Sequence, residues 1–279
     1  MEFSVSTLTI IFMAVSALIS IGLPVAFFVY IFRKHKAKFL PMLAGIAGFV
    51  IFALVLESLL HMVVFGNFPV LTEKPFLYIL YGIFAAGIFE ETARFISFSI
   101  LKKKFKGVVT GLSYGIGHGG IEAIIIVGIA MINGIISSIV YNAGNLESLT
   151  ANLDPEQLVQ LYNQLGSFIV SPSYLFIIGG IERIFAMSIH LSLSVVVFYS
   201  VYSKDKLWLY PAAILLHAII NIPAAAYQIG VLNNIFVIEG LTLIGAALTV
   251  LAALFVHSKL KENPVIPAEN VQIASLQQE

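Results

Sequence analysis

The sequence contains no cysteine and few charged residues. The lack of cysteine excludes disulfide bonds, thiolate metal sites and a cysteine nucleophile. Charged residues make up 11% of the 279 positions, whereas about 25% is usual for a soluble domain. The 15 basic and 15 acidic residues cancel to a formal net charge of zero. This balance argues against a nucleic acid as the main partner.

Apolar residues take the place of the missing charges. The chain is 59% hydrophobic, with a mean hydropathy of +0.98, while about 45–50% apolar residues is usual. A soluble core could not bury so much apolar surface, so membrane lipid is the expected partner of much of it. The first apolar run, Phe3 to Phe32, is too long for a signal-peptide core, and its basic cluster follows it. It is therefore expected to be a retained first span.

A membrane-spanning helix needs roughly 20 apolar residues, and the sequence predicts about seven such helices. They cover approximately residues 4–32, 39–65, 76–101, 107–140, 173–202, 207–227 and 231–256. We expect one transmembrane domain over residues 1–262, with a catalytic-like core at 76–227. Residues 263–279 are polar and are predicted to form a flexible cytoplasmic tail.

The basic residues predict the orientation of the spans. Of the 15 Lys and Arg residues, only Lys74 lies in a loop on the other side, and Arg94 and Arg183 lie inside spans. The remainder follow the first, third, fifth and seventh spans: Arg33, Lys34, Lys36, Lys38, Lys102, Lys103, Lys104, Lys106, Lys204, Lys206, Lys259 and Lys261. Basic loops stay in the cytoplasm, so the N-terminus is predicted outside and the C-terminus in the cytoplasm.

One predicted outer loop, residues 141–172, is much longer than the others. Within it, Asp154 and Pro155 are typical of a helix start, with an N-cap aspartate and a proline at the first helical position. A short amphipathic or re-entrant helix is therefore expected there. The sequence shows no internal repeat.

Several ionisable residues lie inside the predicted spans. Each charged group at the centre of a transmembrane helix costs about 2.5–3.5 kcal/mol, so these groups must pair, stay neutral or line a wet cavity. Such groups are functional by default. They are Glu57, Glu90, Glu91, Arg94, Glu122, Glu182, Arg183, His61, His118, His190 and His217.

The third span carries Glu90, Glu91 and Arg94. Helical spacings of three and four place the guanidinium within reach of one carboxylate. The other carboxylate is then suited to be a general base. The alternative is a buried ion pair that only sets helix packing.

The fourth span combines small residues with a histidine and an acid. His118 and Glu122 share one helix face at a spacing of four. Gly111, Gly115 and Gly119 form a stripe along which another helix can approach closely. Glycines that frame a histidine and a glutamate favour a site at a helix contact.

The fifth and sixth spans add further polar groups. In the fifth, His190 is expected to face a polar cavity, while Glu182 and Arg183 are interpreted as a structural pair. In the sixth, His217 and Asn221 share a face and can donate hydrogen bonds to an oxyanion.

The depth of these groups indicates a single site. Glu90, Glu122, His190 and His217 each fall near the middle of their own span. The predicted fold is therefore an all-α membrane protein whose helices bundle around a central polar site. Glu57 and its neighbour His61, in the second span, are interpreted as structural or peripheral.

The order of these motifs resembles a known group of membrane enzymes. A paired glutamate with arginine, an aromatic residue four before His118, a mid-helix histidine and His217-x-x-x-Asn221 resemble the CAAX prenyl endopeptidase and bacteriocin-processing (CPBP) superfamily. The likeness is closer to its PrsW and YhfC branches of bacterial intramembrane proteases, and closest to YhfC. It covers residues 76–227.

The resemblance implies a role for each matching residue. One glutamate of the pair, Glu90 or Glu91, activates water. In the second motif, His118 matches the histidine of the CAAX branch and Glu122 matches the glutamate of the PrsW branch, and this sequence contains both. The spacing to the arginine is that of PrsW-like proteins. The implied catalytic residues are Glu90, Glu91, Arg94, His118, Glu122, His190, His217 and Asn221.

The implied activity is hydrolysis of a peptide bond in or near the membrane. The substrate is a membrane-embedded or membrane-proximal peptide, and the location a bacterial cell membrane that the protein crosses several times. Glu122, His190 and His217 are the expected ligands if the site holds Zn²⁺ with one open position. Water activated by glutamate without a metal fits these residues equally well.

Two other classes of function use the same residues. A transporter or channel could relay protons or bind a cation with them, although that class often shows inverted repeats. A non-catalytic immunity or regulatory protein could keep the same fold without turnover.

Overall fold

The computed structural model describes residues 4–261, which contain helices and no strand. Seven helical stretches are long and apolar enough to cross a membrane, as the sequence predicted. The predicted tail at 263–279 lies outside the described residues. The spans are α1 (Thr7–His35), α2 to α3 (Phe39–Asn67), α5 (Pro75–Leu101), α6 to α7 (Val109–Asn142), α10 (Tyr174–Tyr202), α11 (Leu209–Gln228) and α12 (Ile235–Lys261).

Two spans contain π-helical segments that the sequence did not predict. Segments of this kind are rare and often occur at functional sites. Glu57 is the last residue of the first segment, and Glu122 lies two residues before the second. The second span consists of α2 (Phe39–Gly48), η1 (Phe49–Glu57) and α3 (Ser58–Asn67), and the fourth of α6 (Val109–Ala123), η2 (Ile124–Ile129) and α7 (Ala130–Asn142).

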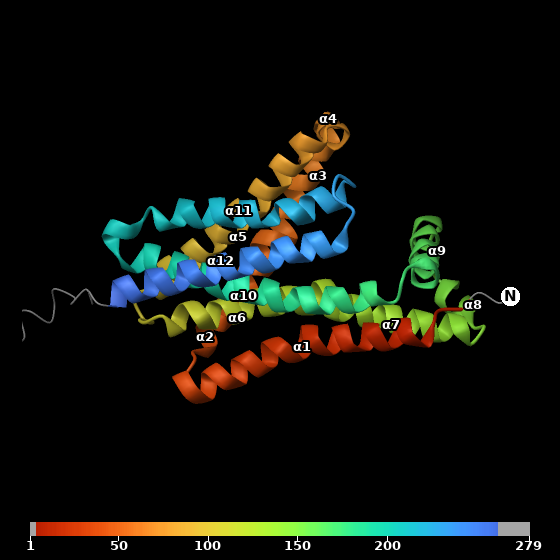
Figure 1. Ribbon diagram of the computed structural model, residues 1–279, viewed down its shortest axis with the longest axis horizontal. Coiled ribbons are helices and arrows are strands. Elements are labelled where there is room, and N and C mark those ends of the chain that lie inside the picture. The colour runs from red at the N-terminus through yellow and green to blue at the C-terminus, as the bar shows by residue number, and fades with distance from the viewer. Residues whose placement is uncertain (1–3, 262–279) are drawn as a thin grey trace, which may run out of the picture.

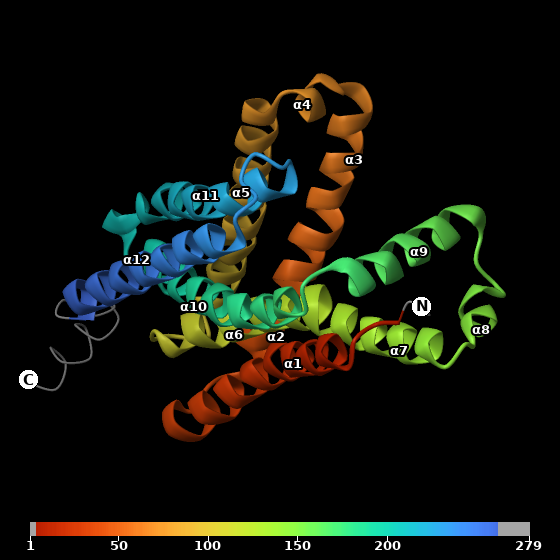
Figure 2. The ribbon, with the colours of Figure 1, turned by 45° about the vertical axis from the view of Figure 1, so that its right-hand side comes forward.

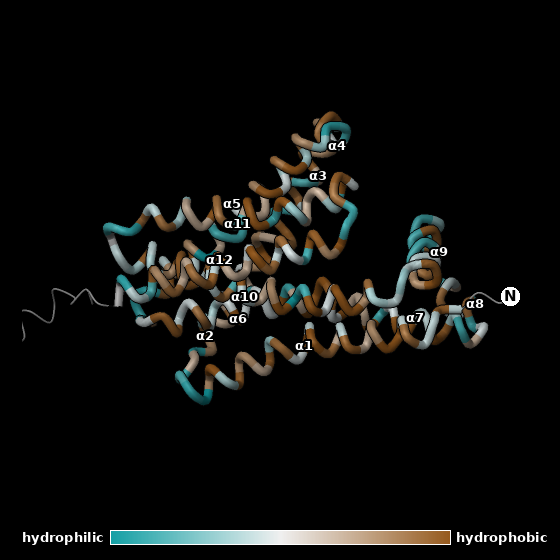
Figure 3. The backbone as a smooth tube through the Cα atoms, in the orientation of Figure 1, coloured by the Kyte–Doolittle hydropathy of each residue, from teal (hydrophilic) through white to brown (hydrophobic). Residues whose placement is uncertain are grey.

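Helix α10 is the most buried of the seven spans and forms the centre of the bundle. Helices α1, α6 and α12 pack along it, while α5 packs against α11 (Figure 1). Large apolar side chains such as Leu18, Phe76 and Ile100 remain more than 70% exposed. Hydrophobic residues run along the spans, while hydrophilic ones gather at the ends of the bundle and in α9 (Pro155–Val170) (Figure 3). This distribution is that of a protein surrounded by lipid.

Glycines hold α6 between two neighbouring helices. The predicted stripe of Gly111, Gly115 and Gly119 faces α10, where a Cβ added at Gly119 would lie 2.9 Å from the Cβ of His190. On the other face, a Cβ added at Gly117 would lie 2.0 Å from the carbonyl oxygen of Met42 in α2. The expectation of a close helix approach is therefore confirmed, and the approach occurs on two faces.

The bundle opens into two arms at one end. Figure 2 shows α3, α4 (Val70–Glu73) and the start of α5 rising away from α7 and α9. Aromatic residues join α3 to α5, because Phe65 stacks on Tyr78 with ring centroids 5.8 Å apart. The site described below lies where the arms meet.

The long loop contains α8 (Leu146–Thr150) and α9. The predicted helix start is confirmed, because the Asp154 side chain accepts a hydrogen bond from the backbone N–H of Gln157 at 2.8 Å. The Gln157 side chain in turn accepts one from the backbone N–H of Asp154 at 3.1 Å. Leu165 and Phe168 bury the apolar face of α9 in a cluster with Met13.

The close approach at Gly117 makes a testable prediction. Gly117→Ala forces α2 and α6 apart, so we expect the free energy of unfolding to fall by about 1–3 kcal/mol or more. Gly179→Ala is the matched control, because its added Cβ meets nothing within 4 Å. Thermal unfolding in detergent micelles measures both variants. Equal midpoints for the two variants would contradict the tight contact.

Candidate active site

A polar cavity of about 470 Å³ lies among the second to seventh spans. Its wall includes Glu90, Glu122, His190, His217 and Asn221, which come from four different helices. Bundling around a central polar site is therefore confirmed. The catalytic roles of these residues remain predictions.

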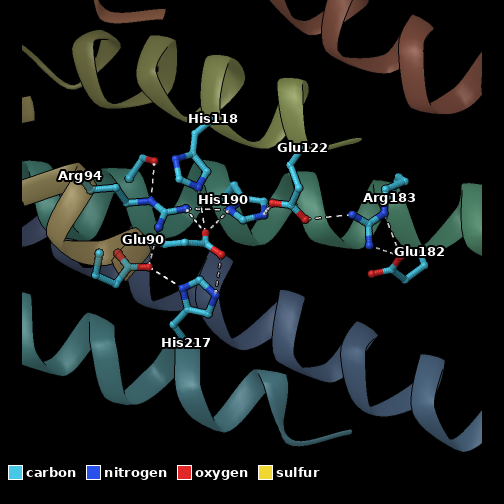
Figure 4. A network of polar contacts seen from close by, with 10 residues as sticks. Glu90, Arg94, His118, Glu122, Glu182, Arg183, His190 and His217 are labelled. Carbon is cyan, nitrogen blue, oxygen red and sulfur yellow. Dashed lines mark hydrogen bonds and ion pairs between the residues drawn. The ribbon is translucent and has the colours of Figure 1, made fainter. Parts of the chain in front are cut away.

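Glu90 is the acid on which the histidines converge. Its Oε2 atom lies 2.9 Å from His118 Nε2 and 3.6 Å from His190 Nδ1. Its Oε1 atom lies 3.8 Å from His217 Nε2. Three imidazoles from three other helices thus surround one carboxylate (Figure 4).

Glu91 occupies a different position from its neighbour. It is fully buried and is not part of the cavity wall. Its Oε1 atom accepts hydrogen bonds from Arg94 Nη1 at 2.7 Å and from His217 Nδ1 at 2.6 Å. Of the two glutamates, Glu90 therefore faces the cavity, and Glu91 fixes the side chains around it.

Arg94 connects the third span to the fifth. The sequence predicted contact with one glutamate, and Arg94 lies close to both, at 2.7 Å from Glu91 and 3.6 Å from Glu90. Its Nη2 atom also donates to His190 Nδ1 at 2.7 Å, and Nε donates to Ser194 Oγ at 3.3 Å. Ser194 carried no sequence signal, because a serine in an apolar span matches no motif.

Glu122 lies between His190 and Arg183. Arg183 Nη1 donates to Glu122 Oε1 at 2.9 Å, and Arg183 also donates two hydrogen bonds to Glu182 (Figure 4). The expected pair of Glu182 and Arg183 is therefore present, and Arg183 is in addition shared with Glu122 of the site. Glu122 reaches His190 and Arg183 because α6 packs against α10.

Four side chains offer a possible metal site. Glu90, His118, Glu122 and His190 each present one ligand atom, and these atoms all lie within 4.8 Å of one another. Imidazole nitrogens and carboxylate oxygens are suitable ligands for Zn²⁺. Glu122 and His190 were among the expected ligands. Among residues 4–261, His217 is outside this group.

The arrangement around Glu122 fits a metal. Its buried Oε2 atom lies 2.6 Å from His190 Nε2 and has no other polar partner within residues 4–261. Because Arg94 donates to His190 Nδ1, the neutral ring carries its proton on Nε2, between the ring and Glu122. A divalent ion can replace that proton, so the residues present fit a divalent ion.

Glu57 and His61 also line the cavity. Of the two interpretations, structural or peripheral, their place in the wall contradicts the peripheral one and leaves the structural one. The second span contacts α5 at this level, where His61 Nδ1 and the Tyr81 hydroxyl form a hydrogen bond of 2.8 Å. The signal was present in the sequence as an acid and a histidine four residues apart.

Comparison with known proteins decides the family. A family model described as YhfC intramembrane metalloprotease matches residues 16–242. The chain belongs to this family. The match to YhfC includes every helix that contributes to the site, and the resemblance predicted from the motifs is confirmed.

A curated relative supports the same assignment. The chain is 36% identical over 250 residues to a Bacillus subtilis (strain 168) protein named "Uncharacterized membrane protein YhfC". The alignment covers 88% of this chain and 95% of that protein. No solved structure matches the chain. The protein is a multi-pass membrane protein, and the bacterial relative fits the expected location.

The central arginine gives a second prediction. Arg94→Met leaves Glu91 buried without its cation, which is expected to lower the free energy of unfolding by about 3–5 kcal/mol. Arg33→Met, at the exposed end of α1, is the matched control and should leave stability nearly unchanged. Thermal unfolding in micelles compares them. A midpoint for Arg94→Met equal to that of the control would contradict a structural role of this ion pair.

Proposed function

We propose that this chain is an intramembrane metalloprotease that hydrolyses a peptide bond within or at the edge of the membrane. The observation that supports this most strongly is the gathering of ligand atoms from Glu90, His118, Glu122 and His190 within 4.8 Å. Glu90, Glu122 and His190 line a cavity between membrane-spanning helices, and the fully buried His118 lies behind its wall. The name of the family points to the same chemistry.

His118, His190 and Glu122 would hold the metal ion. Two histidines and one glutamate are the ligands of a well-known class of catalytic zinc site, which keeps one position open. A divalent ion bound there acts as a Lewis acid toward the peptide carbonyl. This choice differs from the set expected from the sequence, since His118 replaces His217.

Glu90 is then free to act as the general base. It lies beside the three proposed ligands and faces the cavity, so it can accept a proton from the attacking water. The same carboxyl group can return that proton to the nitrogen of the leaving amine. Glu91 is too buried to do this and serves as a positioning residue.

His217 and Asn221, both on α11, add two further polar groups to the cavity wall. Because His217 Nδ1 donates to Glu91, Nε2 of the neutral ring is an acceptor rather than a donor. His217 can therefore accept a proton from Glu90 once that carboxylate has taken one from water. The side-chain amide of Asn221, which also lines the cavity, is the better donor to an oxyanion.

The cavity has room for both reactants. One water molecule occupies about 30 Å³ in the liquid, so a volume of about 470 Å³ accommodates several waters and a short peptide segment. The substrate is accordingly a peptide that reaches the cavity from the membrane or its surface.

Loss of the proposed base tests the function. Purified protein is incubated with bacterial membranes, and new peptide N-termini are quantified by mass spectrometry. Glu90→Gln removes the proton acceptor without changing side-chain volume and should reduce their formation by about 10²–10⁴-fold. Glu156→Gln, exposed on α9, is the control. Equal yields from the native chain and Glu90→Gln would refute the proposal.

Metal content tests the ligand set independently. The native chain, loaded with Zn²⁺ and then dialysed, should retain about one ion per chain, measured by inductively coupled plasma mass spectrometry. His118→Ala and Glu122→Ala each remove a ligand and should lose most of it. His257→Ala is the control, because His257 bonds to Tyr199 and lies outside the cavity wall. Zinc retention by both ligand variants at the native level would rule out this set.

A further inference from the structure

One acid of the cavity is not used by the proposed mechanism. Glu57, at the end of η1, is only 9% exposed and lies in the same cavity wall as Glu90 and Glu122. Within 4 Å its carboxylate has one basic neighbour among residues 4–261, which is His61 Nε2 at 3.4 Å. Neither carboxylate oxygen of Glu57 takes part in a hydrogen bond within this part of the chain.

The charges of the cavity wall leave Glu57 without a cation. The wall contains four acids, and Arg183 is its only Lys or Arg among the described residues. Arg183 is bonded to Glu122 and Glu182, and Arg94 contacts Glu90 from behind the wall. Burying a charged carboxylate inside a membrane costs free energy unless a cation pairs with it. Glu57 therefore has a place for a cationic partner that the protein itself does not fill within the described residues.

The surroundings of Glu57 match an alkyl chain that ends in a positive charge. Phe65 and Tyr78 line the same cavity and stack on each other. Aromatic faces attract cations and cover the methylene groups of lysine and arginine. Tyr81 holds the ring of His61 through a hydrogen bond of 2.8 Å to Nδ1, so its Nε2 atom stays turned toward Glu57.

We propose that Glu57 and His61, with the wall of Phe65 and Tyr78, form a subsite for a cationic group of the peptide substrate. That group is a primary ammonium, carried either by a lysine side chain or by a free N-terminus. The subsite rests on the proposed function, because it recognises the peptide that Glu90 helps to cleave. It selects substrates with a positive charge near the bond that is cut.

Binding to a chain that carries Glu90→Gln tests the subsite without requiring cleavage. The probe is a fluorescent membrane-spanning peptide of leucine and alanine, acetylated and amidated at its ends, with one lysine or, in the matched peptide, norleucine. A third peptide has no lysine but a free N-terminus. Binding to the protein in lipid nanodiscs is followed by fluorescence anisotropy.

We expect one of the two ammonium peptides to bind about tenfold or more tightly than the norleucine peptide. Comparing the lysine peptide with the free N-terminus peptide identifies which ammonium group the subsite binds. Adding Glu57→Gln should abolish the preference, while Glu73→Gln, exposed on α4, should keep it. Equal binding of all three peptides, or a preference that survives Glu57→Gln, overturns the proposal.

The two proposals can fail separately. Binding that depends on Glu57, with no cleavage by the native chain, keeps the subsite and rejects the protease. Cleavage by the native chain together with equal binding of the three peptides keeps the protease and rejects the subsite.

Discussion

The buried guanidinium of Arg94 connects the parts of this site. It pairs with Glu91 on its own helix, donates to His190 and Ser194 on α10, and through Glu91 is linked to His217 on α11. A cation in the interior of a membrane protein is stable only with such partners. The requirement to satisfy this one side chain therefore fixes the relative positions of three helices and the orientation of two histidines.

Close helix packing supplies the other half of the geometry. With no side chain at Gly115 or Gly119, α6 lies against α10 at the level of His190. His118 and Glu122 then lie on either side of the His190 ring. His190 is therefore held by two kinds of contact. It is hydrogen-bonded to Arg94 of α5, and it packs in van der Waals contact against Gly119 of α6. The metal site proposed above depends on both.

The cavity also has an organised outer part. Arg183 pairs with Glu122 and Glu182 on one side, and aromatic residues of α3 and α5 line the wall with Glu57 and His61 on another. The groups of the proposed catalytic site and those of the proposed subsite therefore share one cavity, at different places on its wall.

The sequence by itself determined the seven spans, the common depth of the polar groups and the family, because span length, hydropathy and motif order are local properties. It also predicted the helix start at Asp154 and the glycine face of α6. Only the tertiary structure distinguished Glu90 from Glu91, joined Arg183 to Glu122 and placed Glu57 in the cavity. These three placements depend on contacts between helices, which are not local in sequence. They also depend on the π-helical segments next to Glu57 and Glu122, where the directions of side chains differ from those that α-helical spacing predicts.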